Sequence, residues 1–392
     1  MNAPTRFDTE VIGSLPILIA YLDRLKLAET IDRVVPWEGE IPLGTLTAVL
    51  VLNRLLNPKA MFRIEDWAQT SGVAAYYGLE PNQLNDDRLG RALERLATHT
   101  DTIQAPLVLQ AVKAFALDVS QIHYDLTSIE FSGAYEPAVA RATPSEGATP
   151  ATSAPQPTYG RSKSGRKHVK QVQAGINVTG DGAVPVCHAA FDGHTAESTT
   201  HADNVRRLKE ILPTSELLDI ADTKRDTEEN LWAIVDAKGT FLCGGAFNVG
   251  LQQRFLKHDR DLKPVTYWPK SQEKWAPDER DQYQAFELTE RLGRIVDGNK
   301  QKHAYRVLFV WSESKERQEI QTRERHVAKI RAEFDAIQRN LNRDTLKDEK
   351  TILRRLEKAK GLYAEGSLFE YTLAGKQGSY TLTWGQNAMA RT

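Results

Sequence analysis

Apolar residues in the first part of the chain recur every three or four positions, which is the spacing of one face of an α-helix. Leu18, Leu22 and Leu25 follow this spacing, and the later stretch TLTAVLVLNRLLN is almost entirely apolar. NDDRLGRALERLA places capping residues before another amphipathic run. We therefore expect residues 1–118 to form a compact helical domain. Such bundles can carry helix-turn-helix units that read DNA, but a role in packing or dimerisation fits the same pattern.

The alternation shortens to every second residue in QIHYDLTSIEF, residues 121–131. Ile122, Tyr124 and Leu126 point to one face of an extended strand, and Asp125 points to the other. The β-branched and aromatic residues on both sides predict a strand buried in a sheet. An ionised carboxylate buried there without a partner is costly, so we expect Asp125 to face a second acid, with a cation between the two.

Two segments after this strand are predicted to lie outside regular structure. Residues 136–160 are rich in Ala, Pro, Ser and Thr, which predicts a flexible surface loop. The segment RSKSGRKHVK follows and carries five cations without an acid: Arg161, Lys163, Arg166, Lys167 and Lys170. A solvated charged loop explains these cations, and beside a functional strand they would also form a patch that contacts DNA phosphates.

Residues 170–247 alternate between strand and helix patterns. A hairpin signal at Gly180–Gly182 joins two strands, and a helix, a strand, a second helix and another strand follow. This order favours an α/β fold, with a mixed sheet whose first strand holds Asp125 and with helices on the faces of the sheet. We place this core at residues 119–249.

The last part of the chain predicts a helical hairpin over residues 315–363. Apolar residues keep a three-four spacing from Val327 to Leu341, the segment NRD interrupts them, and a second helix continues with Leu353 and Leu356. The final piece, SYTLTWGQNAMART, begins as a strand.

The composition narrows the class of protein. At 392 residues the chain can build two or three domains, and its net charge of −1 means that DNA would have to be held by local basic patches. Two cysteines, Cys187 and Cys243, lie in apolar runs, which excludes a Cys-rich zinc site. The chain has no run of about 18 apolar residues and no signal-peptide pattern, so we expect no membrane partner and a cytoplasmic location.

Asp222 is the second candidate functional residue. It ends the apolar strand LLDIAD, and an acid at the carboxyl end of a strand is well placed to bind a metal ion. Two or three acids from different strands suit Mg²⁺, and two such ions about 4 Å apart could drive an in-line attack on a phosphodiester. Spacing alone leaves helix capping and salt bridging open as roles for Asp125 and Asp222.

Four further residues suggest a zinc site as an alternative: His188, His194, His201 and Asp203. No pair among them has a tight helical ligand spacing such as His-x-x-x-His, and the run FDGHTAESTTHADN is typical of a strand end and a turn. The pattern therefore favours magnesium over zinc.

Together these motifs resemble the bacterial insertion-sequence transposases of the DDE class, in the IS-four superfamily, and the branch with a helical N-terminal domain of unknown function. HYDLTSIEF is similar to the first catalytic motif and IADTKRDTEENL to the second, which maps the two metal-binding aspartates onto Asp125 and Asp222. Asp219, two residues before Asp222, is the weaker alternative. GRSKSGRKHVKQVQAGINVTGDGAVPV and DGHTAES resemble the strands and turn between the two motifs.

The resemblance implies an RNase H-like core in which Mg²⁺, or Mn²⁺ in its place, is held by two aspartates and a glutamate. Such an enzyme cuts transposon ends and joins them to target DNA. The resemblance therefore implies that the protein binds terminal inverted repeats and target DNA, and that it acts as a homodimer on the DNA. Residues 250–380 would form an insertion, and residues 381–392 would begin the return to the core. Trp268 and Trp275 would stack on a distorted base or belong to a core.

The sequence departs from the family at the glutamate. Family members carry it after the insertion in a tyrosine, arginine and glutamate pattern, which does not occur after Asp222; Glu357, Glu365 and Glu370 lack that context. We therefore expect a C-terminally truncated product that cannot complete strand transfer unaided. Two alternatives are a chain that only binds transposon ends or dimerises with intact copies, and a metal-dependent nuclease of the same fold without end specificity.

Overall fold

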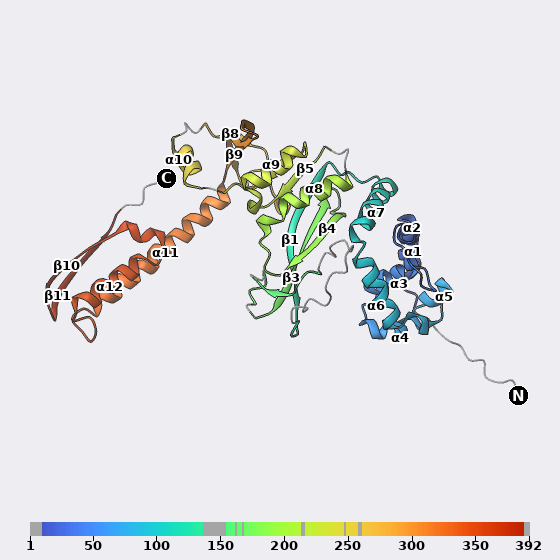
Figure 1. Cartoon of the computed structure of the whole chain (residues 1–392). Helices are drawn as coiled ribbons and strands as arrows, with labels where there is room; N and C mark the ends of the chain where they lie inside the picture. The colour runs from blue at the N-terminus through green and yellow to red at the C-terminus, as the bar shows by residue number, and fades with distance from the viewer. Residues whose placement is uncertain are drawn as a thin grey trace. The chain divides into compact units, whose positions relative to one another are not determined.

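The structure is a computed structural model, and it describes residues 10–135, 154–160, 163–166, 168–212, 216–246, 248–257 and 261–387. The chain divides into two compact units (Figure 1). We call Met1–Asn248 the N-terminal unit and Val249–Thr392 the C-terminal unit. Within the described part of the chain, no helix is long and apolar enough to cross a membrane.

The N-terminal unit begins with helices, as the sequence predicts. The helices are α1 (Leu15–Arg24), α2 (Leu27–Val34), α3 (Leu43–Leu56), η1 (Met61–Arg63), α4 (Ile64–Ala68), α5 (Val73–Tyr77), η2 (Pro81–Leu84), α6 (Asp86–Ala97) and α7 (Thr100–Phe115). Their apolar faces share one core, in which Leu46, Leu52 and Leu89 are completely buried. The Asn85 side chain caps α6 by accepting a hydrogen bond from the Arg88 amide at 3.0 Å, so the predicted capping signal is confirmed.

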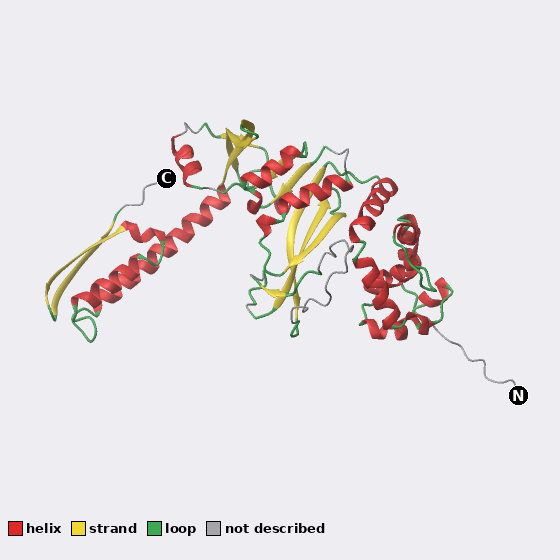
Figure 2. Cartoon of the chain, viewed as in Figure 1, coloured by secondary structure: helices red, strands yellow, loops and turns green. Residues whose placement is uncertain are grey.

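A mixed sheet follows the helices (Figure 2). Its strands are β1 (Gln121–Phe131), β2 (Thr158–Tyr159), β3 (Lys170–Thr179), β4 (Pro185–Asp192), β5 (Leu218–Ala221) and β6 (Thr240–Cys243). The strand order is β2-β3-β1-β5-β6, and β4 also pairs with β3. β3 is antiparallel to β1 and β4, whereas β5 is parallel to β1 and β6. The predicted mixed α/β architecture is therefore confirmed.

Helical segments connect the strands of the sheet: η3 (Glu197–Thr199), α8 (His201–Ile211), η4 (Thr223–Arg225) and α9 (Glu228–Asp236). α8 packs against the sheet through Leu208 and Ile211, which share a buried cluster with Ile122 and Val186. At the start of α8, the His201 ring packs against Tyr124 of β1.

β1 corrects one prediction. Ile122, Tyr124 and Leu126 are buried, as the alternation predicts, but Asp125 lies on an exposed face and its side chain is 73% exposed. The prediction of a strand buried on both faces was wrong. Alternation with period two shows which residues share a face of a strand, but it does not show whether another element covers that face.

The C-terminal unit contains its own elements: α10 (Val249–Lys257), β7 (Lys263–Val265), η5 (Lys270–Gln272), β8 (Tyr283–Val296), β9 (Asn299–Ser312), α11 (Glu313–Arg339), α12 (Glu349–Lys360), η6 (Ala364–Leu368), β10 (Phe369–Lys376) and β11 (Ser379–Gln386). α11 and α12 form the predicted helical hairpin, with Ile330, Phe334, Ile352 and Leu356 buried between them.

The final strand does not behave as the family resemblance predicts. Residues 381–392 are expected to begin a return to the core sheet, but the described part of this segment belongs to β11, which pairs along its length with β10. Leu382 of β11 is buried in the same cluster as Phe369 and the helical hairpin. The alternating strand β11 thus pairs and packs within the C-terminal unit.

Candidate functional site

Asp125 and Asp222 come from neighbouring parallel strands. The β1–β5 ladder pairs Ile122 with Asp219 and His123 with Ile220, a constant offset of 97 in residue number. The same offset brings Asp125 level with Asp222, two residues beyond the last pair of the ladder. Asp125 lies within β1, and Asp222 directly follows the carboxyl end of β5, where ligands bind in open α/β sheets.

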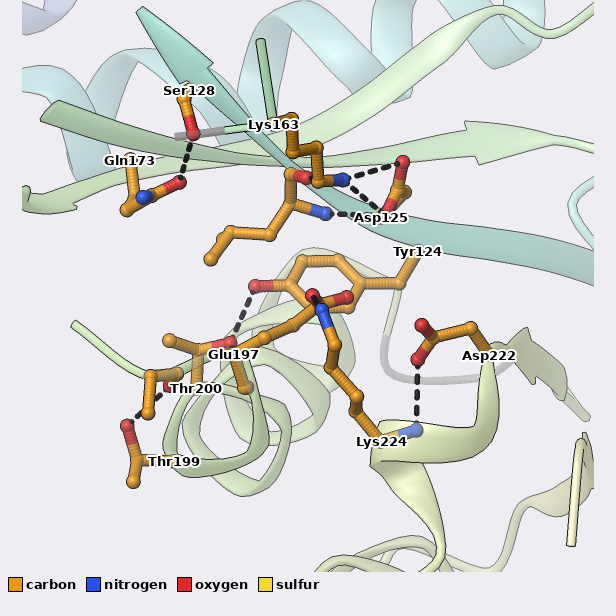
Figure 3. A network of polar contacts seen from close by, with 12 residues as sticks. Tyr124, Asp125, Ser128, Lys163, Gln173, Glu197, Thr199, Thr200, Asp222 and Lys224 are labelled. Atoms are coloured by element: carbon orange, nitrogen blue, oxygen red, sulfur yellow. Dashed lines mark hydrogen bonds and ion pairs between the residues drawn. The ribbon is translucent and has the colours of Figure 1, made fainter. Parts of the chain in front are cut away.

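Asp125 has a direct partner, which is a lysine and not a second acid. Lys163 Nζ lies 3.2 Å from Asp125 Oδ1 and 3.4 Å from Oδ2, and it also donates to the Leu126 carbonyl oxygen (Figure 3). Both side chains are more than half exposed, so this ion pair contributes little to stability and is open to exchange with solvent ions or ligands.

Asp222 stands at the turn from β5 into η4. Its Oδ1 accepts a hydrogen bond from the Lys224 amide at 2.9 Å, which caps η4. The capping role that the sequence left open is therefore real, but it uses only one of the carboxylate oxygens in the described contacts.

Glu197 is a third carboxylate at the site, and no sequence motif indicated it. It is the first residue of η3 and is buried, and its Oε2 accepts a hydrogen bond from Lys224 Nζ. This bond is the main cause that raises the pKa of Lys224, and the charges of Glu197, Asp222 and Asp125 add to the increase. Lys224 thus interacts electrostatically with all three carboxylates, which Figure 3 labels.

His201 completes the cluster at the first position of α8. It is 0% exposed, and neither ring nitrogen has a hydrogen-bond partner among the described residues. Burial, aided by the Arg225 charge, lowers the pKa of His201 to about 4, although Asp222 opposes the shift, so the ring is neutral at pH 7. Leaving a buried polar group unpartnered costs about 1–3 kcal/mol.

Glu197, His201 and Asp222 form a group of potential metal ligands. One ligand atom from each lies within 4.8 Å of the others, and within the described ranges these three residues are the group with this geometry. Tyr124 packs edge-on against the His201 ring at 5.1 Å between centroids and donates to or accepts from Thr200 Oγ1 at 2.9 Å. These contacts hold the ring in place.

A buried ion pair lies next to the site, between η4 and β5. Arg225 Nη2 lies 2.6 Å from Asp219 Oδ1, and the two side chains are 1% and 4% exposed. Burial raises the pKa of Asp219, against the lowering effect of Arg225. Asp219 thus holds η4 against β5 through this ion pair. It does not belong to the group of potential metal ligands.

A cleft with a volume of 770 Å³ lies beside Glu197, and Asp125 and Asp222 are not among its lining residues. Its lining includes Glu197 and two cations, Lys163 and Lys224, together with the polar side chains of Ser128 and Gln173. Ser128 Oγ donates to Gln173 Oε1 at 3.1 Å across its wall. The cleft therefore combines cations with hydrogen-bonding groups, which are the features that contact a phosphodiester backbone.

The other predicted cations have different surroundings. Arg166 Nη1 lies 3.2 Å from Glu130 Oε2, and Lys170 Nζ donates to the carbonyl oxygens of Ala134 and Tyr135. Arg161 and Lys167 lie outside the described residues, as does most of the predicted loop at 136–160.

The four residues of the zinc alternative do not come together in the described structure. His188 bonds through its backbone to Gln104, His194 Nδ1 lies 3.1 Å from Thr158 Oγ1, and Asp203 pairs with Arg206. Of these four, the site contains His201 alone. No helical spacing in the sequence joins His201 to Glu197, because Glu197 begins η3 whereas His201 begins α8.

Gly193 holds the segment that leads to Glu197 close to the sheet. A Cβ at this position would collide with the Gln171 carbonyl oxygen and would lie 2.6 Å from the Thr158 carbonyl oxygen. We expect Gly193→Ala to lower the free energy of unfolding by about 1–3 kcal/mol, because both neighbours are backbone atoms of paired strands. Urea denaturation measures this change.

Gly90→Ala is the matched control for that experiment. Gly90 lies within α6, and a Cβ there would meet nothing within 4 Å. Alanine favours helix over glycine by about 1 kcal/mol, so this variant should be as stable as the original protein or more stable. Equal effects of the two substitutions would contradict the steric explanation.

Comparisons with known proteins give limited matches. No curated protein matches the sequence. Among solved structures, the Mos1 transposase paired-end complex with left transposon end is distantly similar, with 12% sequence identity and a TM-score of 0.21, and the match covers 62% of this chain and 71% of that chain. The Mos1 mariner paired end complex with Mn is similar at the same level, with 11% sequence identity and a TM-score of 0.21, and the match covers 61% of this chain and 70% of that chain. Residues 7–104, less than half of the chain and within its helical N-terminal part, match the family described as Domain of unknown function (DUF4277).

Proposed function

We propose that this protein is a DDE-class transposase that acts at transposon ends with a divalent ion, Mg²⁺ or Mn²⁺. The chain alone should nick these ends, whereas joining them to target DNA would need an intact copy, because no glutamate after Asp222 lies in the family's pattern. The observation that carries the proposal is that β1 and β5 are adjacent and parallel, with Asp125 within β1 and Asp222 directly after β5, near a cleft lined by Lys163 and Lys224. The sequence motifs that resemble the first and second catalytic motifs of these enzymes contain the same two aspartates.

An RNase H-like core is part of the proposal. Its support is the strand order: an antiparallel group of β1, β3 and β4 continues into β5 and β6, which run parallel to β1 on its other side. Because one fold can host many functions, the two aspartates and the cleft carry more weight than the sheet.

Asp125 and Asp222 would hold the ion, since Mg²⁺ takes one or two carboxylates and fills its other positions with waters and phosphate oxygens. When bound, the ion supplies a Lewis acid that stabilises negative charge on phosphate oxygens and lowers the pKa of a water. Lys163 lies on Asp125 and lines the cleft, so it can exchange the carboxylate for a phosphate oxygen of the DNA. We assign further backbone contacts to Arg161, Arg166, Lys167 and Lys170, and a homodimer to the DNA-bound state.

A second candidate function is DNA binding without cleavage, alone or in a dimer with an active copy. The observation that favours it is the pairing of two site carboxylates with lysines: Asp125 with Lys163 and Glu197 with Lys224. Lysines that neutralise the acids permanently would keep a metal ion out. Gel shift with DNA that flanks the gene separates the candidates, because end-specific binding without cleavage under any divalent ion supports binding alone.

Removal of the metal ion provides the first test. The full chain should nick a supercoiled plasmid that carries the DNA flanking its gene when Mn²⁺ or Mg²⁺ is present, and excess EDTA should abolish the nicking because the ion's Lewis acidity is lost. A matched plasmid without the flanking DNA controls for end specificity. Equal nicking of both plasmids would instead indicate a nuclease of the same fold that does not recognise ends.

A further inference from the structure

His201 is a buried imidazole without a partner, at a point where two carboxylates converge. It is fully buried, both of its nitrogens lack hydrogen-bond partners among the described residues, and it belongs to a ligand group with Glu197 and Asp222. A histidine that only filled space in a core would normally bond at least one nitrogen to a neighbour. This ring therefore calls for an explanation that the aspartate pair does not supply.

We propose that Glu197, His201 and Asp222 bind one divalent transition-metal ion. The inference rests on the proposed function in one respect, because it shares Asp222 with the proposed catalytic pair. Asp125 is not a member of the group.

The donor set defines the class of ion. One imidazole nitrogen and two carboxylate oxygens form a mixed set, and imidazole suits first-row transition metals, whereas Mg²⁺ prefers oxygen ligands. An ion at this point would also give a His201 nitrogen the partner that it lacks. Mn²⁺ and Zn²⁺ are therefore the probes, and Mg²⁺ should bind more weakly than either.

Lys224 occupies part of this site in the structure. Its ammonium group donates to Glu197 Oε2, while its side chain is 53% exposed and that of Glu197 is 6% exposed. A buried carboxylate needs a compensating cation, and here the cation comes from a long, half-exposed side chain that can withdraw into solvent. Lys224 thus acts as an internal competitor of the metal ion.

Metal titration of the full chain without DNA tests the proposal. Mn²⁺ binding is followed by loss of the free-ion signal in electron paramagnetic resonance, and Zn²⁺ binding by calorimetry. We expect His201→Phe and Glu197→Gln each to weaken binding by roughly 10–100-fold or more, because the first removes a ligand and the second removes the negative charge of a ligand. Phenylalanine keeps the ring shape and leaves no buried nitrogen, so the fold of that variant, checked by circular dichroism, should be retained.

Lys224→Met separates a metal-binding role of His201 from a structural one, because this variant should change the affinity for Mn²⁺ only if the metal site exists. Removing the ammonium group leaves Glu197 without its cation, so the affinity for Mn²⁺ should rise by about tenfold or more. Asp203→Asn, an exposed carboxylate on α8 outside the group, is the matched control and should leave the affinity unchanged.

The outcomes distinguish this inference from the proposed function. Loss of Mn²⁺ binding in Asp125→Asn with normal binding in His201→Phe would place the ion on the aspartate pair and overturn the inference, while the proposed function would stand. Binding that depends on His201 in a protein whose DNA cleavage persists after Asp125→Asn would support the inference and reject the proposed aspartate pair. Absence of Mn²⁺ and Zn²⁺ binding at millimolar concentrations in both the original protein and Lys224→Met would overturn the inference.

Discussion

Asp219→Ala should lower the free energy of unfolding by about 3–5 kcal/mol, the cost of leaving a buried charge without its partner. Arg225 is 1% exposed, and its Nη2 forms an ion pair with Asp219 Oδ1 at 2.6 Å. Without the carboxylate the guanidinium must either remain charged in a dry environment or pull η4 away from β5. Urea denaturation followed by circular dichroism measures the loss.

Two variants define the cause of this effect. Asp203→Ala removes an exposed carboxylate whose ion pair with Arg206 is on the surface, so its stability should change by no more than about 0.5 kcal/mol. The double variant Asp219→Leu with Arg225→Met replaces the buried pair with apolar groups and should recover most of the lost stability. A loss of less than about 1 kcal/mol in Asp219→Ala would show that the pair does not anchor the site.

Asp222→Asn should reduce the rate of Mn²⁺-dependent DNA cleavage by about a thousandfold or more. The ion contributes several kcal/mol of transition-state stabilisation, and about 4 kcal/mol corresponds to three powers of ten in rate. The asparagine oxygen can still accept the hydrogen bond that the Lys224 amide donates at 2.9 Å, so η4 and the fold should be retained. Single-turnover cleavage of a labelled DNA end measures the rate.

The control for that experiment compares binding with cutting. Asp222→Asn should bind the same DNA with unchanged or slightly higher affinity, because it removes a negative charge near the phosphates. Asp203→Asn should cleave at the original rate. If Asp222→Asn cleaved within tenfold of the original rate, Asp222 would be a helix cap without a catalytic role.

The periodicity of the sequence predicted much of the fold because it is a local property. The three-four spacing predicted the N-terminal helices and the α11–α12 hairpin, and the strand and helix alternation predicted the mixed sheet. The fate of the last strand could not be predicted in this way. An alternating segment such as Ser379–Gln386 looks the same whether it joins the core sheet or pairs with the neighbouring β10, and only tertiary packing decides between these arrangements.

The site was harder to predict than the fold. Asp125 and Asp222 could be proposed from the sequence because each stands on or at the end of an apolar strand. Glu197 and Lys224 could not, because their pairing joins residues 27 positions apart and neither lies in a periodic segment. The prediction that Asp125 is buried was wrong because the alternation in β1 contains no information about what covers the second face of the strand.

The proposed function requires Asp125 and Asp222 for the cutting of DNA at transposon ends. The direct measurement is to incubate the full chain with Mn²⁺ and a supercoiled plasmid that carries the DNA flanking its gene, and to map the cleaved strands by sequencing. We predict breaks at the outer boundaries of terminal inverted repeats that are absent with Asp125→Asn and with Asp222→Asn. Breaks that persist in both variants, or a protein that binds these ends and never cuts them, would contradict the central claim.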